Sequence, residues 1–244
     1  MLWSWHQFLQ ELLTLGYAHA AWTTLWAATV VEVAAVIGGF ALALASRSGL
    51  TSLRLTAGIY VWIWRGTPLL VQLLIVYFGL PQVGIRLGVV GSGITTFILN
   101  ESAYMSVFAA AALTGVRSGQ YEASKMLGLT GWSTFRLIIF PQAFRLFIPV
   151  LGNQFNYMLK TTSLLSIISL VELTRFSEVQ VNLTYQPSEV FAVAALYYLA
   201  LTILWSGVQR LLDAKFGTSH ATNRLARRRG RTVMIRRLVP GRAS

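Results

Sequence analysis

The sequence predicts an all-α membrane protein with five transmembrane helices, its N-terminus outside the cell and its C-terminus in the cytoplasm. Of the 244 residues, 55% are hydrophobic and only 11% are charged, and the mean hydropathy is +0.59. A soluble domain carries about a quarter charged residues. Several stretches reach the roughly 20 apolar residues that a helix needs to cross the hydrocarbon of a bilayer. The basic residues gather near the C-terminus, and this asymmetry predicts the orientation.

Residues 4–16 predict a short interfacial helix, since Trp3 and Trp5 suit the headgroup zone. No Lys or Arg precedes Arg47, so the basic region of a secretory signal is missing and residues 1–46 are expected to stay in the mature chain. Three stretches qualify as spans with at most one interior charge: 22–45, 94–116 and 190–209.

Two further spans carry interruptions. The stretch 56–78 contains Arg65-Gly66-Thr67-Pro68 in its middle, and a break is expected there because proline lacks a backbone donor and disfavours helix in the preceding residue. The stretch 137–159 qualifies if Arg145 and its two prolines are buried against protein. The run 164–171 is too short to span and is expected to re-enter the membrane or lie flat.

The charge distribution sets the topology. Residues 210–244 hold ten of the twenty Lys and Arg residues and one acid, so the positive-inside rule places the C-terminus in the cytoplasm. We therefore divide the chain into an extracytoplasmic interfacial segment (1–19), a transmembrane domain (20–215) and a basic cytoplasmic tail (216–244). The tail fits either an arm on anionic lipid or a solvated extension that only fixes orientation.

The second cytoplasmic loop, 118–134, predicts a short helix, a turn and a new helix. Ser118 suits the N-cap, Glu122 the first turn, Gly128 a left-handed C-terminal position and Thr130 the cap of the next helix. A helix of two turns is not stable alone in water. It must pack on its own bundle or in the groove of a partner, and both interpretations are open at this point.

This loop resembles the EAA signature of permease subunits of ABC importers. That signature reads Glu-Ala-Ala, three residues, Gly, nine residues, Ile, one residue and Leu-Pro. Here Glu122-Ala123-Ser124 is followed in register by Gly128, Ile138 and Phe140-Pro141. Ser124 replaces the second Ala and Phe140 replaces Leu.

Other stretches are similar to polar amino acid permeases of the histidine and glutamine type, and together they cover roughly residues 20–212. They are residues 65–72, 77–81, 102–104, 160–164 and 171–173. The resemblance implies a type I ABC importer half-pore of five helices in the bacterial cytoplasmic (inner) membrane. It also implies that Glu122, Ala123, Ser124 and Gly128 couple the chain to an ATPase.

The partners implied by the resemblance are a cytoplasmic ABC ATPase dimer, a second permease subunit (identical or sister) and an extracytoplasmic amino acid binding protein, besides membrane lipid. The chain has no Gly-x-x-x-x-Gly-Lys loop, so ATP and Mg²⁺ are expected on the ATPase and no cofactor on this chain. With no cysteine and three isolated histidines, neither a metal site nor a catalytic residue is expected. The basic tail lacks a folded reading module, so no nucleic acid partner is expected.

Polar residues inside the spans are candidates for the substrate pathway, because they are costly in lipid and normally face the bundle interior. On the fourth span they recur at helical spacing, and others lie in the second and third spans. They are Asn153, Gln154, Asn156, Lys160 and Thr161 on the fourth span, Asn100, Glu101 and Tyr104 on the third, and Gln72 after the break in the second. They would hold the charged head of an amino acid or form polar contacts between helices or subunits. The fourth-span set contains no acid, which favours a neutral polar or acidic amino acid over a basic one.

Glu32 lies alone in the middle of the first span, where a charge costs several kcal/mol, and we expect it to contact a helix or subunit rather than substrate. A secondary transporter or channel subunit without an ATPase partner is the alternative function, although such proteins normally show an internal repeat. A membrane-embedded hydrolase would need a base, and no histidine lies within the spans.

Overall fold

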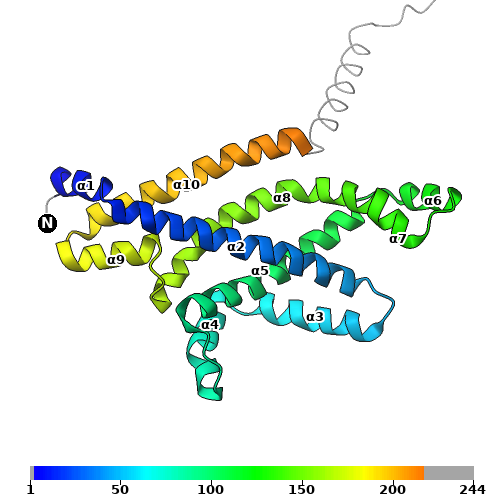
Figure 1. Ribbon diagram of the computed structural model, residues 1–244, viewed down its shortest axis with the longest axis horizontal. Coiled ribbons are helices and arrows are strands. Elements are labelled where there is room, and N and C mark those ends of the chain that lie inside the picture. Colours follow the sequence, from blue (N-terminus) through cyan, green and yellow to red (C-terminus); the bar gives the residue numbers. More distant parts are fainter. Residues whose placement is uncertain (1–2, 217–244) are drawn as a thin grey trace, which may run out of the picture.

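A computed structural model describes residues 3–216 (Figure 1). Within this range the chain folds into ten α-helices joined by shorter helical segments. The α-helices are α1 (Trp5–Leu12), α2 (Leu15–Ser46), α3 (Thr51–Gly66), α4 (Leu69–Leu74), α5 (Gly88–Thr114), α6 (Ser118–Met126), α7 (Gly131–Thr134), α8 (Phe140–Thr161), α9 (Leu173–Thr184) and α10 (Pro187–Phe216). Two π-helices, η1 (Ile75–Gly79) and η3 (Phe135–Ile139), and two 3₁₀-helices, η2 (Leu80–Val83) and η4 (Thr162–Ile168), complete the set. Apart from Phe216, the expected basic tail lies outside the described residues.

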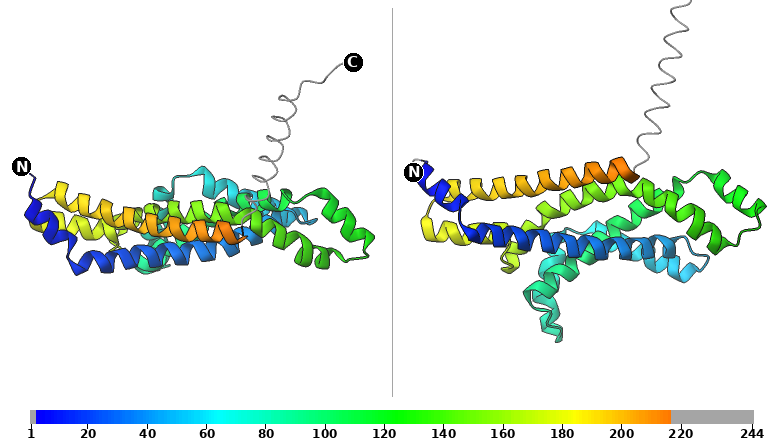
Figure 2. Two further views of the ribbon diagram at one scale, coloured as in Figure 1. Left: turned by 90° about the horizontal axis from the view of Figure 1, so that it is seen from above. Right: turned by 45° about the horizontal axis from the view of Figure 1, so that its top comes forward.

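The long helices run alongside one another, and the connections gather at two opposite ends, except for the segment between α3 and α5, which projects sideways (Figures 1 and 2). The turn between α2 and α3 and the loop α6–α7 lie toward one end, and α10 runs toward that same end. α1 and α9 lie at the opposite end. This grouping agrees with the alternation expected from the charges, while the choice of which end faces the cytoplasm stays a prediction.

Four helices or helix runs are long and apolar enough to cross a membrane: Leu15–Ser46, Gly88–Thr114, Gly131–Ile168 and Pro187–Phe216. A bent pair, Thr51–Gly66 and Leu69–Val83, would make a fifth. Each of these helices begins before the stretch predicted from hydropathy, and all except α5, which stops at Thr114, also end after it. The domain boundary expected after residue 19 falls inside α2.

The predicted break in the second span is confirmed, but its size was not expected. The two halves meet at an angle of 103°, so residues 56–78 do not form one straight crossing helix. Thr67 is extended, with φ −123° and ψ 148°, as expected for a residue before proline. The second half, α4 with η1 and η2, points away from the bundle (Figure 1).

The chain between α8 and α10 holds a helix that the sequence analysis missed. Residues 164–168 of the run 164–171 belong to η4, and the next residue, Ser169, has a left-handed backbone (φ 67°). The helix α9 begins directly after Glu172. The Glu172 carboxylate accepts hydrogen bonds from the N–H groups of Thr174 and Arg175 at 3.0 and 2.8 Å. That N-cap was the available sequence signal for α9.

α5 occupies the centre of the bundle and packs closely against α2. A Cβ added to Gly39 would lie only 2.4 Å from the Cβ of Met105, so the two helices meet backbone to side chain at this point. Larger buried side chains fill the space on both sides of this contact, including Phe97, Leu159 and Phe147. The polar residues of α5 therefore lie within the packed core.

Candidate functional site

The loop α6–α7 projects from one end of the bundle (Figure 1). Within it Glu122 and Ala123 are exposed, whereas Ser124 is fully buried and its hydroxyl donates to the carbonyl of Gln120. Gly128 has φ +71°, and its N–H donates to the carbonyl of Lys125 at 3.0 Å. The predicted left-handed position of this glycine is confirmed.

The cap predictions for this loop had mixed outcomes. Thr130 caps α7, and its hydroxyl accepts the N–H of Ser133 at 3.2 Å, as predicted. Ser118 as an N-cap is wrong, because the helix begins one residue earlier: Arg117 is the N-cap and Ser118 the first helical residue. A serine followed by a helix-compatible sequence does not by itself fix the starting residue.

Large apolar side chains cover the tip of the loop. Met126 is 91% exposed, Leu127 75% and Trp132 68%. The loop lies at one end of the long helices rather than along them (Figure 2). Such a group of exposed apolar side chains indicates a surface for another protein.

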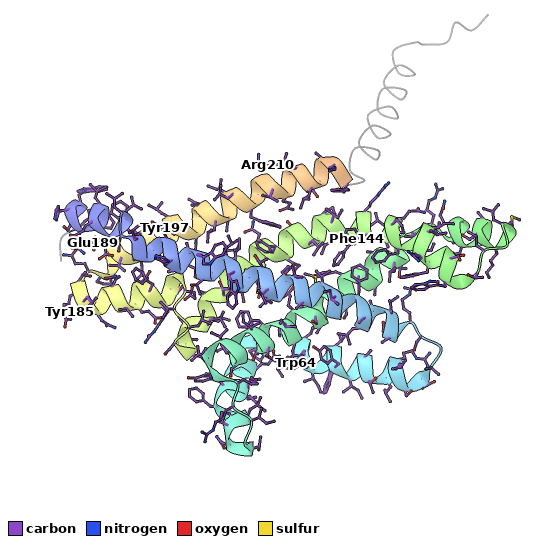
Figure 3. The ribbon with its side chains drawn as sticks, viewed as in Figure 1. Trp64, Phe144, Tyr185, Glu189, Tyr197 and Arg210 are labelled. Atoms are coloured by element: carbon purple, nitrogen blue, oxygen red, sulfur yellow. The ribbon has the colours of Figure 1, made fainter. Side chains whose placement is uncertain are left out.

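Gln72 and Asn100 meet beside Trp64, near the bend between α3 and α4; Trp64 is labelled in Figure 3. Residue 68 is a proline, so the carbonyl of Trp64 has no N–H four residues later to accept. The amides of Gln72 and Asn100 each donate to this carbonyl at 2.9 Å. Asn100 also donates to the Gln72 oxygen at 2.8 Å, and Gln72 to the Thr67 hydroxyl at 2.6 Å. Both side chains are buried and hold the bend in place.

Glu101 and Gln154 form a second polar pair, between α5 and α8. The amide of Gln154 donates to the Glu101 carboxylate at 2.9 Å, and Glu101 is almost completely buried. Glu32 on α2 is also buried, and its carboxyl oxygens have no hydrogen-bond partner within residues 3–216. Glu32 and Glu101 are thus two buried acids on neighbouring helices, because α2 packs directly against α5.

The remaining pathway candidates do not join these two groups through hydrogen bonds of their own. Asn153 is exposed and accepts from Gln209 at 3.3 Å, and the oxygen of half-buried Asn156 has no partner in the described part of the chain. Lys160 is exposed, and Thr161 donates to the carbonyl of Tyr157 in its own helix at 2.9 Å. The ring of Tyr104 lies under the guanidinium of Arg65, 5.1 Å from its centroid, in cation–π geometry.

An open apolar cavity of about 990 Å³ lies between α2, α8 and α10. Glu32 and Arg145 are the two charged residues on its lining. The span 137–159 was expected only if Arg145, Pro141 and Pro149 were buried against protein. In this chain Pro149 is half-buried, whereas Arg145 and Pro141 are exposed. They point to a surface that the helices of a single chain do not cover.

At the end of the bundle opposite the loop α6–α7, Glu172 connects α9 to α10. Besides capping α9, its carboxylate accepts the hydroxyl of Tyr198 at 2.6 Å. Burial raises the pKa of Glu172 from 4.5 to about 6, while the bonds from Tyr198, Thr174 and Arg175 act to lower that pKa. Nearby, Glu189 at the start of α10 accepts the N–H of Ser4, and Tyr197 donates to the carbonyl of Leu12 (Figure 3).

Comparison with known proteins places this geometry in context. Residues 19–218 match the family model described as "Binding-protein-dependent transport system inner membrane component". The chain is 34% identical over 193 residues to the probable amino-acid ABC transporter permease protein YckA of Bacillus subtilis (strain 168), covering 79% of this chain and 85% of that protein. It is 30% identical over 194 residues to the glutamine transport system permease protein GlnP of Escherichia coli (strain K12), covering 79% and 89%.

A solved structure resembles the whole bundle. The crystal structure of an amino acid ABC transporter with histidines superposes with a TM-score of 0.82 at 31% identity, and the match covers 88% of this chain and 100% of that one.

Proposed function

The chain belongs to the family of binding-protein-dependent transport system inner membrane components, and from this premise we propose that it is the permease subunit of an ATP-driven amino acid importer. It would lie in the bacterial cytoplasmic membrane as a multi-pass protein and form half of the translocation pathway. A second permease, identical or sister, would supply the other half. An extracytoplasmic binding protein would deliver the amino acid.

The observation that carries this proposal is the loop α6–α7. Its residues follow the EAA spacing, and its tip at the end of the bundle exposes Met126, Leu127 and Trp132. Glu122, Ala123, Ser124 and Gly128 would form the part that couples the bundle to a cytoplasmic ATPase dimer, which would hold ATP and Mg²⁺. Apolar side chains on a two-turn helix suit a groove on a partner protein.

The mechanism that fits this arrangement is alternating access. Closure of the ATPase dimer on ATP would displace α6 and α7, and η3 connects α7 directly to α8. α8 in turn bonds to α5 through Gln154 and Glu101. A displacement of the loop would thus reach the buried polar residues as a rigid movement of helices.

The substrate class follows from the charge of the pathway candidates. The α8 set contains amides, a lysine and a threonine but no acid, and this favours a neutral polar or acidic amino acid. The buried Glu32 and Glu101 are the one observation that favours a basic amino acid instead. Competition of labelled glutamine uptake by unlabelled glutamate, histidine and arginine, in vesicles holding the complete complex, decides between them. Stronger inhibition of glutamine uptake by arginine than by glutamate or histidine would refute a neutral polar or acidic substrate.

Purification of the tagged chain from its native membrane tests the ATPase partner. We expect an ABC ATPase to co-elute with the wild-type chain and with Leu183→Asp, but not with Leu127→Asp. The two leucines are matched controls, because they are 75% and 70% exposed and lie at opposite ends of the bundle. Absence of any ATPase from the wild-type preparation would support the alternative, a secondary transporter or channel subunit.

A further inference from the structure

The junction between the loop and α8 has an irregular backbone. Residues Phe135–Ile139 form the π-helix η3, in which the N–H of Phe140 donates to the carbonyl of Phe135 five residues earlier. Pro141 has no N–H, so the carbonyl of Leu137 lacks the donor that an α-helix would supply. π-helical turns inside longer helices often occur at functional sites. The register of the helix can change here with little loss of regular hydrogen bonding.

Gln142 connects this junction to the loop helix. Its amide nitrogen donates to the carbonyl of Ile138 at 2.9 Å and to the side-chain oxygen of Gln120 at 3.2 Å. Gln120 lies in α6, 22 residues earlier in the chain. In the part of the chain that the structure describes, this is the one side-chain hydrogen bond that joins α6 to another helix. Both glutamines are half-buried.

α6 presents two different sides. On the inner side, buried Ser124 donates to the backbone carbonyl of Gln120 and so holds the residue that Gln142 contacts. On the outer side, Glu122, Ala123 and Lys125 are exposed. The inner side is bonded to the junction, while the outer side is exposed among residues 3–216.

On the basis of the proposed function, we propose that Gln142 is a positioning residue that transmits movement of α6 to α8. Its single amide bonds at once to α6 and to the π-helical junction, so the two must move together. Without that amide, α6 would still contact the ATPase through its outer side. Its displacement would then be absorbed by the irregular backbone of η3, and ATP hydrolysis would no longer move α8 efficiently.

The test uses the complete complex, with its own ATPase and binding protein, in lipid vesicles supplied with a radiolabelled mixture of the twenty protein amino acids. The quantity measured is amino acid taken up per ATP hydrolysed. Gln142→Met keeps the length of the side chain but removes the donor, and Gln120→Met removes the acceptor. Each should lower the ratio about fivefold, the equivalent of one net hydrogen bond. The double variant should be no lower than either single one, and Gln120→Glu, which keeps the acceptor, should retain the wild-type ratio.

An unchanged ratio in both methionine variants would overturn the proposal. So would a parallel fall of uptake and hydrolysis at constant ratio, since this would show a role in assembly alone. Hydrogen exchange gives a readout independent of substrate: ATP with vanadate should change exchange in α6 and in residues 135–142 of the wild type, but only in α6 of Gln142→Met. A joint response in that variant would contradict the proposal. A wild-type complex without ATP-driven uptake would instead refute the proposed function.

Discussion

At the scale of single residues, the carbonyl of Trp64 shows how a sequence irregularity determines the use of polar side chains. Pro68 removes its normal partner, and two buried amides replace it. The amides of Gln72 and Asn100 therefore bond to the backbone. From the sequence, both residues were candidates for the substrate pathway as well as for polar contacts between helices. The sequence could predict that buried polar residues would be satisfied, but not by which groups, because those partners come from a different helix.

Asn100→Leu is expected to destabilise the folded chain by about 1–3 kcal/mol. The substitution removes one buried hydrogen-bond donor from the Gln72 side-chain oxygen and one from the Trp64 carbonyl. Asn153→Leu is the matched control, because Asn153 is exposed. Thermal unfolding in detergent measures both. Equal unfolding temperatures for the two variants would contradict the role assigned to the bend.

The raised pKa of Glu172 predicts that the free energy of unfolding depends on pH. Its pKa is raised from 4.5 to about 6 by burial, so the folded chain binds this proton more tightly than the unfolded chain. The corresponding stability is fully present below pH 4.5 and is lost as the pH rises through about 6. The loss amounts to about 2 kcal/mol.

Glu172→Gln, which stays neutral, should remove this part of the pH dependence. Unfolding temperatures of both chains measured between pH 4.5 and pH 7 provide the check. A slope in the variant equal to that of the wild type would show that Glu172 is not the titrating group.

At the scale of elements, hydropathy predicted the long helices, and the resemblance predicted the type I permease fold that the match to a solved amino acid transporter confirms. The 103° bend, α9 and the exposure of Arg145 were not predictable in the same way. The bend angle depends on contacts with α5, which lies far away in the sequence. The helix α9 is short, and its apolar residues follow the helical spacing only in part. The surroundings of Arg145 depend on how neighbouring helices pack.

Gly128→Pro should reduce ATP-driven uptake to background while leaving membrane insertion intact. Proline cannot adopt the observed φ of +71° and removes the N–H that donates to Lys125. Gly84 is a matched control outside the loop, directly after η2 in the segment that points away from the bundle: its φ is +88°, its N–H donates to the carbonyl of Pro81 at 3.1 Å, and open space surrounds it too. If Gly84→Pro abolished uptake equally, the effect would not be specific to the coupling loop.

At the scale of the whole molecule, we propose that the two ends of the bundle carry different functions, and the charge distribution predicts which of them faces the cytoplasm. The grouping of the connections was predictable because consecutive spans run in opposite directions, so that their connections alternate between the two ends. The cytoplasmic side was assigned largely from the basic tail, which lies almost entirely outside the described residues. Topology therefore needs a direct measurement.

Single cysteines in this cysteine-free chain supply that measurement. Ser118 and Ser188 are both exposed and lie at opposite ends. Ser188→Cys should react with an impermeant thiol reagent added to intact cells, and Ser118→Cys should react only after the cells are opened. The reverse pattern would invert the proposed orientation.

ATP-driven uptake tests the central claim most directly. The chain, its ATPase and its binding protein are reconstituted in vesicles with the ATPase side accessible, and transport of a labelled amino acid mixture is followed with ATP, with a non-hydrolysable analogue and with an ion gradient alone. We expect transport only with hydrolysable ATP, and its loss when this chain is omitted. Transport driven by the ion gradient alone, without ATP, would contradict the proposal that this chain is the permease of an ATP-driven importer.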